Sequence, residues 1–325
     1  YQVYLERYKV NAELTSTLRC AYHKYTFGKG DDKSLLVDIR RSNNDVRDWK
    51  IEKVDDNTFT GYQDGDGKIY FYAKTNYKIG QVEMVKDDKH EVAVLRFIDS
   101  KGVEPLEVKA GFSFVSMLNK SFAQVAEEAD AAWEALLSKI QVAGGTEREK
   151  RLFYSTFFHA FKWPALRSDV NHEYTDVRGE VVNNGFHYYT DPSFWDDYRN
   201  KLVLIGMISP DVTTDIIRSI IDKGEKRDGY MPTFFHGDHA STFISGSWLR
   251  GLHDFDLERA YKLILKNATV PGKGGRRYLD EYMERGWIAE KDTVNVPTWD
   301  EYKGAVTKTQ EYAYDDYAVA LVAGR

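Results

Sequence analysis

The sequence lacks the residues and runs that several classes of protein require. Its 325 residues include a single cysteine, Cys20, which excludes an intrachain disulfide and the CxxC motifs of zinc and redox sites. No apolar run reaches the roughly 18 residues that a membrane-spanning helix needs. Lysine and arginine form no basic run, and the formal net charge is -6. We therefore expect no membrane span and no nucleic-acid partner.

Several catalytic and nucleotide-binding fingerprints are also missing. The sequence contains no GxSxG, P-loop or GxGxxG pattern. HGDH (236–239) lacks the i, i+4 histidine spacing of the HExxH zinc proteases. The stretch DGDGK (64–68) lacks the twelve-residue EF-hand pattern with its terminal Glu, so it indicates a turn. These absences leave no common nucleotide, zinc-protease or calcium-loop motif.

The residues that are present indicate a folded protein with large hydrophobic cores. Hydrophobic residues make up 42% of the chain and charged residues 30%, unlike the composition of a disordered chain. Aromatic residues make up 14%. Aromatic rings dominate burial in protein cores, and they also form surfaces on which sugars stack. Composition alone favours the cores.

Residues 1–118 have the pattern of short strands joined by turns. KIYFYAKT, EVAVLRFI and LEVKAGFSFVSM alternate with period two, and DSKG (99–102) has turn chemistry. The last strand should present one face that consists of Val108, Ala110, Phe112 and Phe114. Many short strands with turns between them are typical of a β-sandwich. We expect a partial β-sandwich domain over residues 1–118.

The hydrophobic period changes from two to 3.6 after residue 118. Ser121 with Gln124, and Thr146 with Glu149, have the capping-box spacing, and apolar residues at helical spacing follow each pair. Gly144-Gly145 should stop the first helix. The pattern predicts a helical linker over residues 119–145 and a helical domain over residues 146–325.

The helical domain should contain about six helices in a row with no strand between them. Pro210 is expected at the first turn of one helix. The buried stripe of that helix would be Val212, Ile216, Ile217, Ile220 and Ile221. Further helices are expected over residues 240–250, over 257–268 with Asp256 as the cap, over 276–285 and over 307–323.

SFWDDYRNK (193–201) combines aromatic and charged side chains in one short stretch. It places Asp196 and Asp197 between Trp195 and Arg199. Charged side chains are rarely buried unless they are paired or functional. The stretch is therefore either a solvated turn or the floor of a sugar-binding site.

FFHGDHAST (234–242) places His236, Asp238 and His239 around a glycine that leads into a helix. These groups could carry acid–base chemistry, or the stretch could be a helix N-terminus with Asp238 as the capping residue. Two further stretches, SDVNHEY (168–174) and EYAYDDYA (311–318), combine acids with histidine or tyrosine. On a helix, the two acids of the second stretch, Asp315 and Asp316, point about 100° apart, so only one can face a central cavity.

The clustering of these residues favours a ligand site. Acids and histidines with aromatic and arginine side chains recur where helices begin and end, and in a ring of helices those ends surround one mouth. Carboxylates accept hydrogen bonds from hydroxyl groups, and aromatic faces cover the apolar face of a sugar. We predict that residues 195–199 and 236–239 converge at one opening that suits a neutral, polyhydroxylated ligand.

These motifs, in this order, resemble those of the glycoside hydrolase family 92 α-mannosidases. The stretches that carry the resemblance are ELTSTLRCAYHKYTF (13–27), GFSFVSMLNKSFAQVAEEA (111–129), FYSTFFHAFKWPALRSDVNHEY (153–174), SFWDDYRNK, HGDHASTFISGSWLRGLHDFDLERAY (236–261) and TQEYAYDDYAVA (309–320). The resemblance implies an N-terminal β-sandwich, a linker helix and an (α/α)6 helical barrel that is incomplete in this chain. Residues 146–325 would form the first half of that catalytic barrel.

The resemblance also implies a calcium-dependent, inverting exo-α-mannosidase that removes terminal mannose from glycans. Asp196 and Asp197 would hold the mannose in the subsite before the cleaved bond, and Trp195 and Arg199 would brace them. Calcium, which prefers oxygen ligands, would bind vicinal hydroxyls of the sugar. The catalytic base and most calcium ligands of the family are expected beyond Arg325, and no metal ligand is assigned in this chain.

One departure from the family pattern concerns the general acid. The family has a Glu just before the residues that match HGDHA, and DGYMPTFFHGDHA (228–240) contains no Glu. His236, Asp238 and His239 are therefore the candidate catalytic residues within the chain. A downstream acid and a loss of activity are the alternatives.

Two other functions compete with the α-mannosidase. One is a non-catalytic glycan-binding remnant. The other is a further sugar enzyme with a sandwich and an (α/α)6 barrel, such as a disaccharide phosphorylase, although no phosphate pocket is evident. Expected partners are mannose-containing glycans and, because half a barrel exposes apolar helix faces, the missing part of the enzyme or another copy. The family implies a secreted, periplasmic or cell-surface location, and no signal peptide is visible in the sequence.

Overall fold

The computed structural model describes residues 1–41, 45–65, 67–86, 91–113, 122–169, 171–233, 236–272, 274–290 and 304–325. The chain divides into two compact units, Tyr1–Ser138 and Lys139–Arg325, and each has its own hydrophobic core. Within these described ranges, no helix combines the length and the apolar character needed to cross a bilayer.

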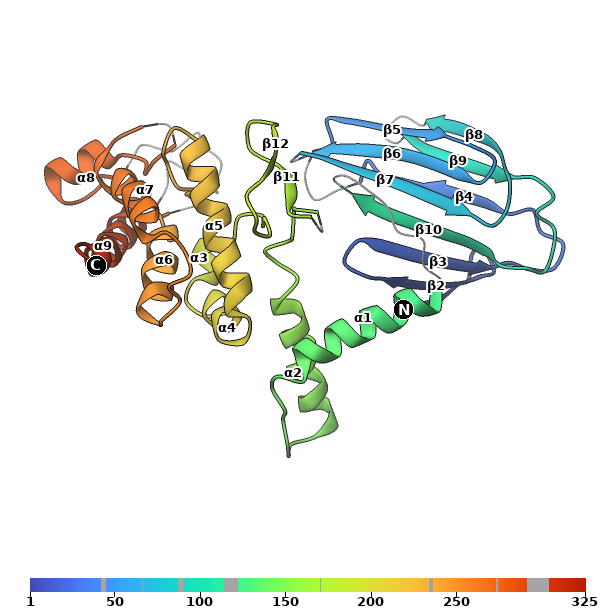
Figure 1. Cartoon of the computed structure of the whole chain (residues 1–325), viewed down its shortest axis with the longest axis horizontal. Helices are drawn as coiled ribbons and strands as arrows, with labels where there is room; N and C mark the ends of the chain where they lie inside the picture. Colours follow the sequence, from blue (N-terminus) through green and yellow to red (C-terminus); the bar gives the residue numbers. More distant parts are fainter. Residues whose placement is uncertain are drawn as a thin grey trace. The chain divides into compact units, whose positions relative to one another are not determined.

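The first unit consists of antiparallel sheets and one helix (Figure 1). Its elements are β1 (Gln2–Leu5), β2 (Val10–Ser16), β3 (Cys20–Thr26), β4 (Ser34–Val37), β5 (Asp48–Lys53), β6 (Thr58–Gly65), β7 (Gly67–Thr75), β8 (Ile79–Lys86), β9 (Glu91–Phe97), β10 (Leu106–Ser113) and α1 (Phe122–Leu137). A seven-stranded sheet has the order β1-β2-β3-β10-β7-β6-β5, and a three-stranded sheet has the order β4-β9-β8. Helix α1 packs against β2 and β3.

The two sheets of the first unit share one core. Ala93 and Leu95 of β9 are fully buried. They are two residues apart, so they lie on the same face of the strand. They form one hydrophobic cluster with Phe59 and Phe71 of the larger sheet, whose rings meet edge-on at 5.8 Å. Burial of apolar side chains between two sheets is the arrangement of a β-sandwich. The predicted strands are confirmed by these elements.

The face predicted for β10 is buried only in part. Val108 is buried, Ala110 is half-buried, and Phe112 is 44% exposed near the end of the strand. Phe114, the last member of that predicted face, lies outside the described residues. The turn predicted at DGDGK joins β6 to β7 in a hairpin that pairs Gly65 with Gly67.

Helix α1 ends earlier than the sequence predicts. Its last residue is Leu137, so the expectation that Gly144-Gly145 terminates the helix was wrong. The Tyr154 hydroxyl donates to the carbonyl of Ile140 and accepts from the amide of Val142. These side-chain bonds engage backbone groups that a longer helix would use. Ser121, the first residue of the predicted capping box, lies outside the described residues.

The second unit consists mainly of helices (Figure 1). Its elements are α2 (Glu147–Ala160), β11 (Glu173–Thr175), β12 (Val181–Asn183), α3 (Phe194–Asp197), α4 (Lys201–Ile208), α5 (Pro210–Lys226), α6 (Ala240–Leu249), α7 (Leu257–Thr269), α8 (Leu279–Arg285) and α9 (Ala305–Val322). Helix α9 packs against α6 and α7, and α5 packs against α4 and α7.

The local signals that predicted helix starts in the second unit are confirmed. Thr146 and Glu149 form a reciprocal capping box before α2, Pro210 occupies the first turn of α5, and the Asp256 side chain accepts from the Arg259 amide at the start of α7. The isoleucines predicted as the stripe of α5 are buried in the core, and Val212 is partly buried against it.

Three parts of the second unit differ from the prediction. The hairpin β11–β12 interrupts the helices, so the expectation of no strand in this domain was wrong, because strands of three residues are too short to show a period. Helix α4 was not predicted, because its sequence KLVLIGMI is almost uniformly apolar and has no 3.6-residue period. Helix α8 starts only at Leu279, since Tyr278 adopts a left-handed conformation with φ 56°.

Candidate functional site

Helix α3 separates the two adjacent aspartates of SFWDDYRNK. The exposed Asp196 accepts a hydrogen bond from the Ser193 hydroxyl at 2.6 Å, at the start of the helix. Asp197 is buried and forms an ion pair with Lys201 at 2.7 Å. The fully buried ring of Phe194 anchors the helix in the core. Asp197 is thus paired inside the protein, and Asp196 lies at the surface.

The structure brings the α3 segment and the 236–239 turn together. The rings of Trp195 and His236 meet edge-on with centroids 5.9 Å apart. The rings of Tyr198 and His239 stack with centroids 4.6 Å apart and an interplanar angle of 22°. The predicted contact between residues 195–199 and residues 236–239 is therefore present, and the prediction that they line one opening for a ligand stays a prediction. We refer to these two segments and the α9 residues that contact them as the α3–α9 cluster.

Glu311 of α9 links the two segments. His239 is completely buried, and its Nε2 lies 2.8 Å from Oε2 of Glu311. Arg199 donates to the other carboxylate oxygen at 3.3 Å and lies over the Tyr198 ring. Burial opposes ionisation of Glu311, but the hydrogen bond from His239 and the charge of Arg199 outweigh it and lower the pKa. Glu311 is thus an ionised acceptor at the edge of the cluster.

Asp238 is not the cap of helix α6. The N-cap position belongs to His239, which makes no side-chain capping bond, so the interpretation of Asp238 as the capping residue was wrong. The Asp238 side chain is fully buried, and its Oδ2 lies 3.5 Å from Nε of Arg276. Its backbone amide donates to Oδ2 of Asp315 at 2.7 Å. The carboxyl group is therefore engaged by Arg276 instead of the helix end.

The paired aspartates of α9 take different positions around Arg276. Asp315 is fully buried, whereas the Asp316 side chain is 40% exposed and pairs with Arg276. Only Asp315 contacts the 236–239 turn directly, as the 100° separation on a helix predicts. Burial raises the pKa of both Asp238 and Asp315, the charge of Asp238 raises the pKa of Asp315 further, and the charge of Arg276 opposes the rise at both groups.

His236 is the half-buried member of the predicted catalytic trio. Asp238 and His239 are both completely buried, whereas His236 keeps part of its surface in contact with solvent. Burial lowers the pKa of His236, and the charge of Lys308 lowers it further. A side chain must reach a substrate to react with it, so His236 is the member of the trio that is placed to touch one.

The remaining histidine and acid stretch lies elsewhere in the second unit. Asp169 and His172 belong to the turn before β11, where the His172 ring packs 4.4 Å from that of His187. Glu173 begins β11 itself. Pairing in a short hairpin accounts for this stretch without a catalytic role.

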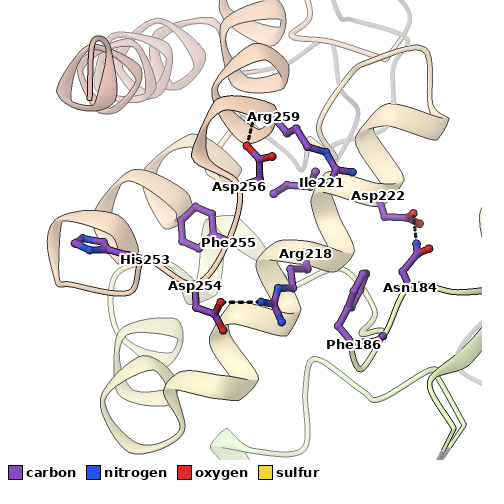
Figure 2. Close-up of a pocket in the computed structure, with 11 residues that line it drawn as sticks. Asn184, Phe186, Arg218, Ile221, Asp222, His253, Asp254, Phe255, Asp256 and Arg259 are labelled. Atoms are coloured by element: carbon purple, nitrogen blue, oxygen red, sulfur yellow. Dashed lines mark hydrogen bonds and ion pairs between the residues drawn. The ribbon is translucent and has the colours of Figure 1, made fainter.

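A separate cavity of about 780 Å³ lies between α5, the segment before α3 and the loop before α7 (Figure 2). None of the seven predicted site residues lines it. Its charged side chains are occupied by the ion pairs Arg218–Asp254, Arg259–Glu225 and Lys226–Asp222, and Asp256 caps α7. We place the site at the α3–α9 cluster, because buried titratable groups from three distant segments converge there.

A resident calcium ion does not fit the described residues by themselves. Calcium takes six to eight oxygen ligands, usually with several carboxylates. Within the described part of the chain, no group of three His, Cys, Asp or Glu side chains is arranged to hold a metal ion. Three carboxylates of the α3–α9 cluster are paired instead with cationic or histidine side chains: Asp197 with Lys201, Asp238 with Arg276, and Glu311 with His239 and Arg199.

Comparison with protein families decides which family the sequence represents. The profile of the glycosyl hydrolase family 92 N-terminal domain matches residues 1–121, and that of the family 92 catalytic domain matches residues 114–325. The chain belongs to glycosyl hydrolase family 92. The resemblance noted from the motifs is confirmed, and the phosphorylase alternative loses its support. No curated protein sequence matches the chain.

Solved structures of family 92 enzymes share this fold. A family GH92 α-mannosidase from Bacteroides thetaiotaomicron matches with a TM-score of 0.85 and 26% identity, covering 98% of this chain and 47% of that one. Its complex with mannoimidazole matches with a TM-score of 0.84 and 26% identity, covering 98% and 46%. A family GH92 inverting mannosidase from the same organism matches at 0.79 and 21% identity, covering 98% and 47%, which shows the fold alone.

These matches confirm the predicted fold class, an N-terminal β-sandwich followed by helices of an (α/α)6 barrel. The chain spans about half the length of the family 92 structures that it matches.

Three residues in or beside the cluster were missed by the sequence reasoning. Glu311 precedes Asp315 by four residues on one helix face, which is a signal that could have been used. Tyr198 lies within the WDDYR stretch, next to residues that were selected. Arg276 carried no local signal, because its importance comes from burial between carboxylates that are distant in sequence.

Proposed function

We propose that this chain forms part of an α-mannosidase that removes terminal mannose from glycans with inversion of configuration and with calcium. The observation that carries the proposal is the convergence of Trp195 and Tyr198 with His236, His239 and Glu311 in a member of family 92. Aromatic faces suit the apolar face of a pyranose, and ionised carboxylates suit its hydroxyl groups.

In this proposal Asp196 and Asp197 bind hydroxyl groups of the mannose, with Trp195 and Arg199 beside them. Asp197 is fixed by Lys201, so its free lone pairs have a set direction. Asp196 is exposed and can turn from Ser193 toward a ligand. The partly exposed Arg199 is held by Glu311 and Tyr198, and we include Glu311 among the groups that accept sugar hydroxyls.

The acid–base assignment is narrower than the sequence suggested. Inverting hydrolysis needs a protonated acid at the leaving oxygen and a base that activates water on the opposite face. Burial keeps His236 mainly neutral, and a neutral imidazole is a weak acid. We propose that His236 donates or accepts a hydrogen bond at the sugar, that Asp238 and His239 support it, and that the acid and the base come from other parts of the protein.

Calcium enters the proposal through the family alone. When bound, it would hold vicinal hydroxyls and favour a distorted sugar ring. Its ligands would come from parts of the protein other than the described cluster. Addition of a chelator to the intact protein should then abolish mannose release, and added calcium should restore it. Full activity in chelator would overturn the calcium assignment.

The central test is binding of mannoimidazole and mannose to the intact protein by calorimetry. Asp197→Ala should weaken binding about 10- to 100-fold, because a hydrogen bond to a charged group contributes about 1.5–3 kcal/mol. The matched control is Asp254→Ala, which removes an acid from the cavity of Figure 2. The opposite result, with Asp254→Ala impaired and Asp197→Ala unchanged, would move the site to that cavity.

Hydrolysis is tested by the release of mannose from a panel of α-mannosides. We expect the first product detected by NMR to be β-mannose, as inversion requires. The absence of a general-acid Glu before HGDHA favours one second function, a glycan-binding protein without catalysis. Tight binding of mannoimidazole with no release of mannose from any linkage would support that function.

A further inference from the structure

The turn that carries His236 and His239 is attached to helix α9 at successive positions. Asp315 accepts the amide of Asp238 at 2.7 Å, and Glu311, one helical turn earlier, contacts His239 at 2.8 Å. Gly304, which precedes the first residue of α9, faces the His236 ring. Helix α6, which follows the turn in sequence, binds only its carbonyl groups, through the hydroxyls of Ser241 and Thr242 and through the first turn of the helix. Helix α9 therefore provides the contacts to the Asp238 amide and to the His239 side chain.

Two glycines allow this close approach. A Cβ on Gly237 would lie 2.4 Å from Cε1 of His239 and 2.9 Å from Oδ2 of Asp315. A Cβ on Gly304 would lie 2.9 Å from Cε1 of His236. Contacts below 3 Å between such atoms are strongly repulsive, so a side chain at either position would displace these groups, and Gly304 also has a φ of 82°, which favours glycine. The turn and α9 are complementary at the level of single atoms.

Arg276 completes the attachment from a third segment. Its guanidinium group is fully buried, with Nε 3.5 Å from Asp238 and Nη1 bound to Asp316 of α9. It also lies over the Tyr312 ring. A buried charge is costly unless it is paired, and losing one partner leaves the other uncompensated. Arg276 therefore links the Asp238 side chain to α9, which is also the helix that binds the Asp238 amide.

We propose that Asp315 and Arg276 are positioning residues, which fix the His236–His239 turn on α9 so that the His236 ring stays beside Trp195. Neither reaches solvent, so neither touches a substrate. The inference rests on the proposed function in one respect, because that function assigns the His236 ring to the sugar.

The test compares two substitutions at Asp315 in the intact protein. Asp315→Asn keeps a side-chain oxygen that accepts the Asp238 amide, whereas Asp315→Ala removes the acceptor. We expect Asp315→Asn to bind mannoimidazole within about threefold of the unmodified protein, and Asp315→Ala to bind at least about tenfold more weakly. A loss in Asp315→Asn equal to that in Asp315→Ala, with both folded, would overturn the proposal, because position 315 would then require a negative charge.

A control separates positioning from a general loss of stability. Asp256→Ala removes the cap of α7 and should cost stability without changing mannoimidazole affinity. If Asp256→Ala weakens binding as much as Asp315→Ala at the same loss in Tm, the effect of Asp315 is merely structural and the proposal fails. Arg276→Lys, which keeps the charge, should retain more affinity than Arg276→Gln.

A readout without sugar distinguishes this proposal from the proposed function. If the unmodified protein binds neither mannose nor mannoimidazole, the proposed function fails while the positioning role is still measurable. The imidazole NMR signals of His236 and His239 should then shift in Asp315→Ala and stay in place in Asp315→Asn. Unchanged signals in Asp315→Ala would overturn the positioning role itself.

Discussion

The carboxyl groups of Asp238 and Asp315 make the stability of the second unit depend on pH. Burial raises the pKa of each from an ordinary value of 3.8 to about 7. The folded state therefore binds these protons more tightly than the unfolded state does. Their stabilising contribution is full below about pH 4 and is lost as the pH rises through about 7. Asp315→Asn, which carries no titrating proton, should gain stability relative to the unmodified protein between pH 4 and pH 8. Urea unfolding at several pH values measures this difference, and parallel curves would contradict it.

Glu311 provides a control of opposite sign. Although burial acts against it, the hydrogen bond with His239 and the charge of Arg199 lower its pKa below 4.5. The stabilising contribution of Glu311 is present above its ordinary pKa. It is lost as the pH falls through the lower pKa that Glu311 has in the folded protein. Glu311→Gln should therefore be less stable than the unmodified protein at pH 7, and the gap should narrow toward pH 3. A gap that widens in acid would show that the pKa is not lowered.

At the scale of residues, the sequence predicts which side chains gather but not how each is used. The local chemistry of SFWDDYRNK and HGDH was enough to predict their convergence. It left open whether Asp238 caps a helix, and the structure excludes the cap, because the Asp238 carboxyl group pairs with Arg276. Glu311 gains its role from a contact with His239, which lies 72 residues away in the sequence. Burial and distant partners are tertiary properties that no local pattern contains.

At the scale of elements, the capping box of α2 offers a direct test. The Thr146 hydroxyl accepts the Glu149 amide at 3.3 Å, and the Glu149 carboxylate accepts the Thr146 amide at 2.7 Å. Thr146→Ala should lower the free energy of unfolding by about 1 kcal/mol. Thr146→Ser, which keeps the hydroxyl, is the matched control and should lose much less. Equal losses in the two variants, measured by urea unfolding, would show that the cap does not stabilise this unit.

Elements with a strong end signal were predictable, and elements without one were not. Thr146, Pro210 and Asp256 fixed helix starts because each satisfies or removes a backbone donor that a helix end leaves free. Helix α4 has no such signal, and its apolar side chains suit either a buried helix or a buried strand. The α8 start depends on the left-handed backbone of Tyr278, which the sequence around it does not indicate.

At the scale of the whole molecule, the change of hydrophobic period predicted a β unit followed by a helical unit. The arrangement of the helices as part of an (α/α)6 barrel came from the family motifs, because periodicity gives the buried face of each helix but not its neighbours. The chain covers about half of the family 92 structures that it matches, so the association with further chain or another copy that we expected from the sequence stays a prediction.

Helix α9 is where that association can be tested. Its inner face contributes Val319 and Val322 to the core, while Val306 and Tyr317 on its outer face are 69% and 59% exposed. Val306 and Tyr317 are eleven residues apart, so they lie on the same side of the helix, and we predict that this side receives the partner segment. We expect the 325-residue chain to self-associate in sedimentation experiments, and the double substitution Val306→Ser with Tyr317→Ser to shift it toward the monomer. The exposed Met207→Ser on α4 is the control and should not change the distribution. A monodisperse monomer with a cooperative melt, in the unmodified chain, would show that α9 needs no partner.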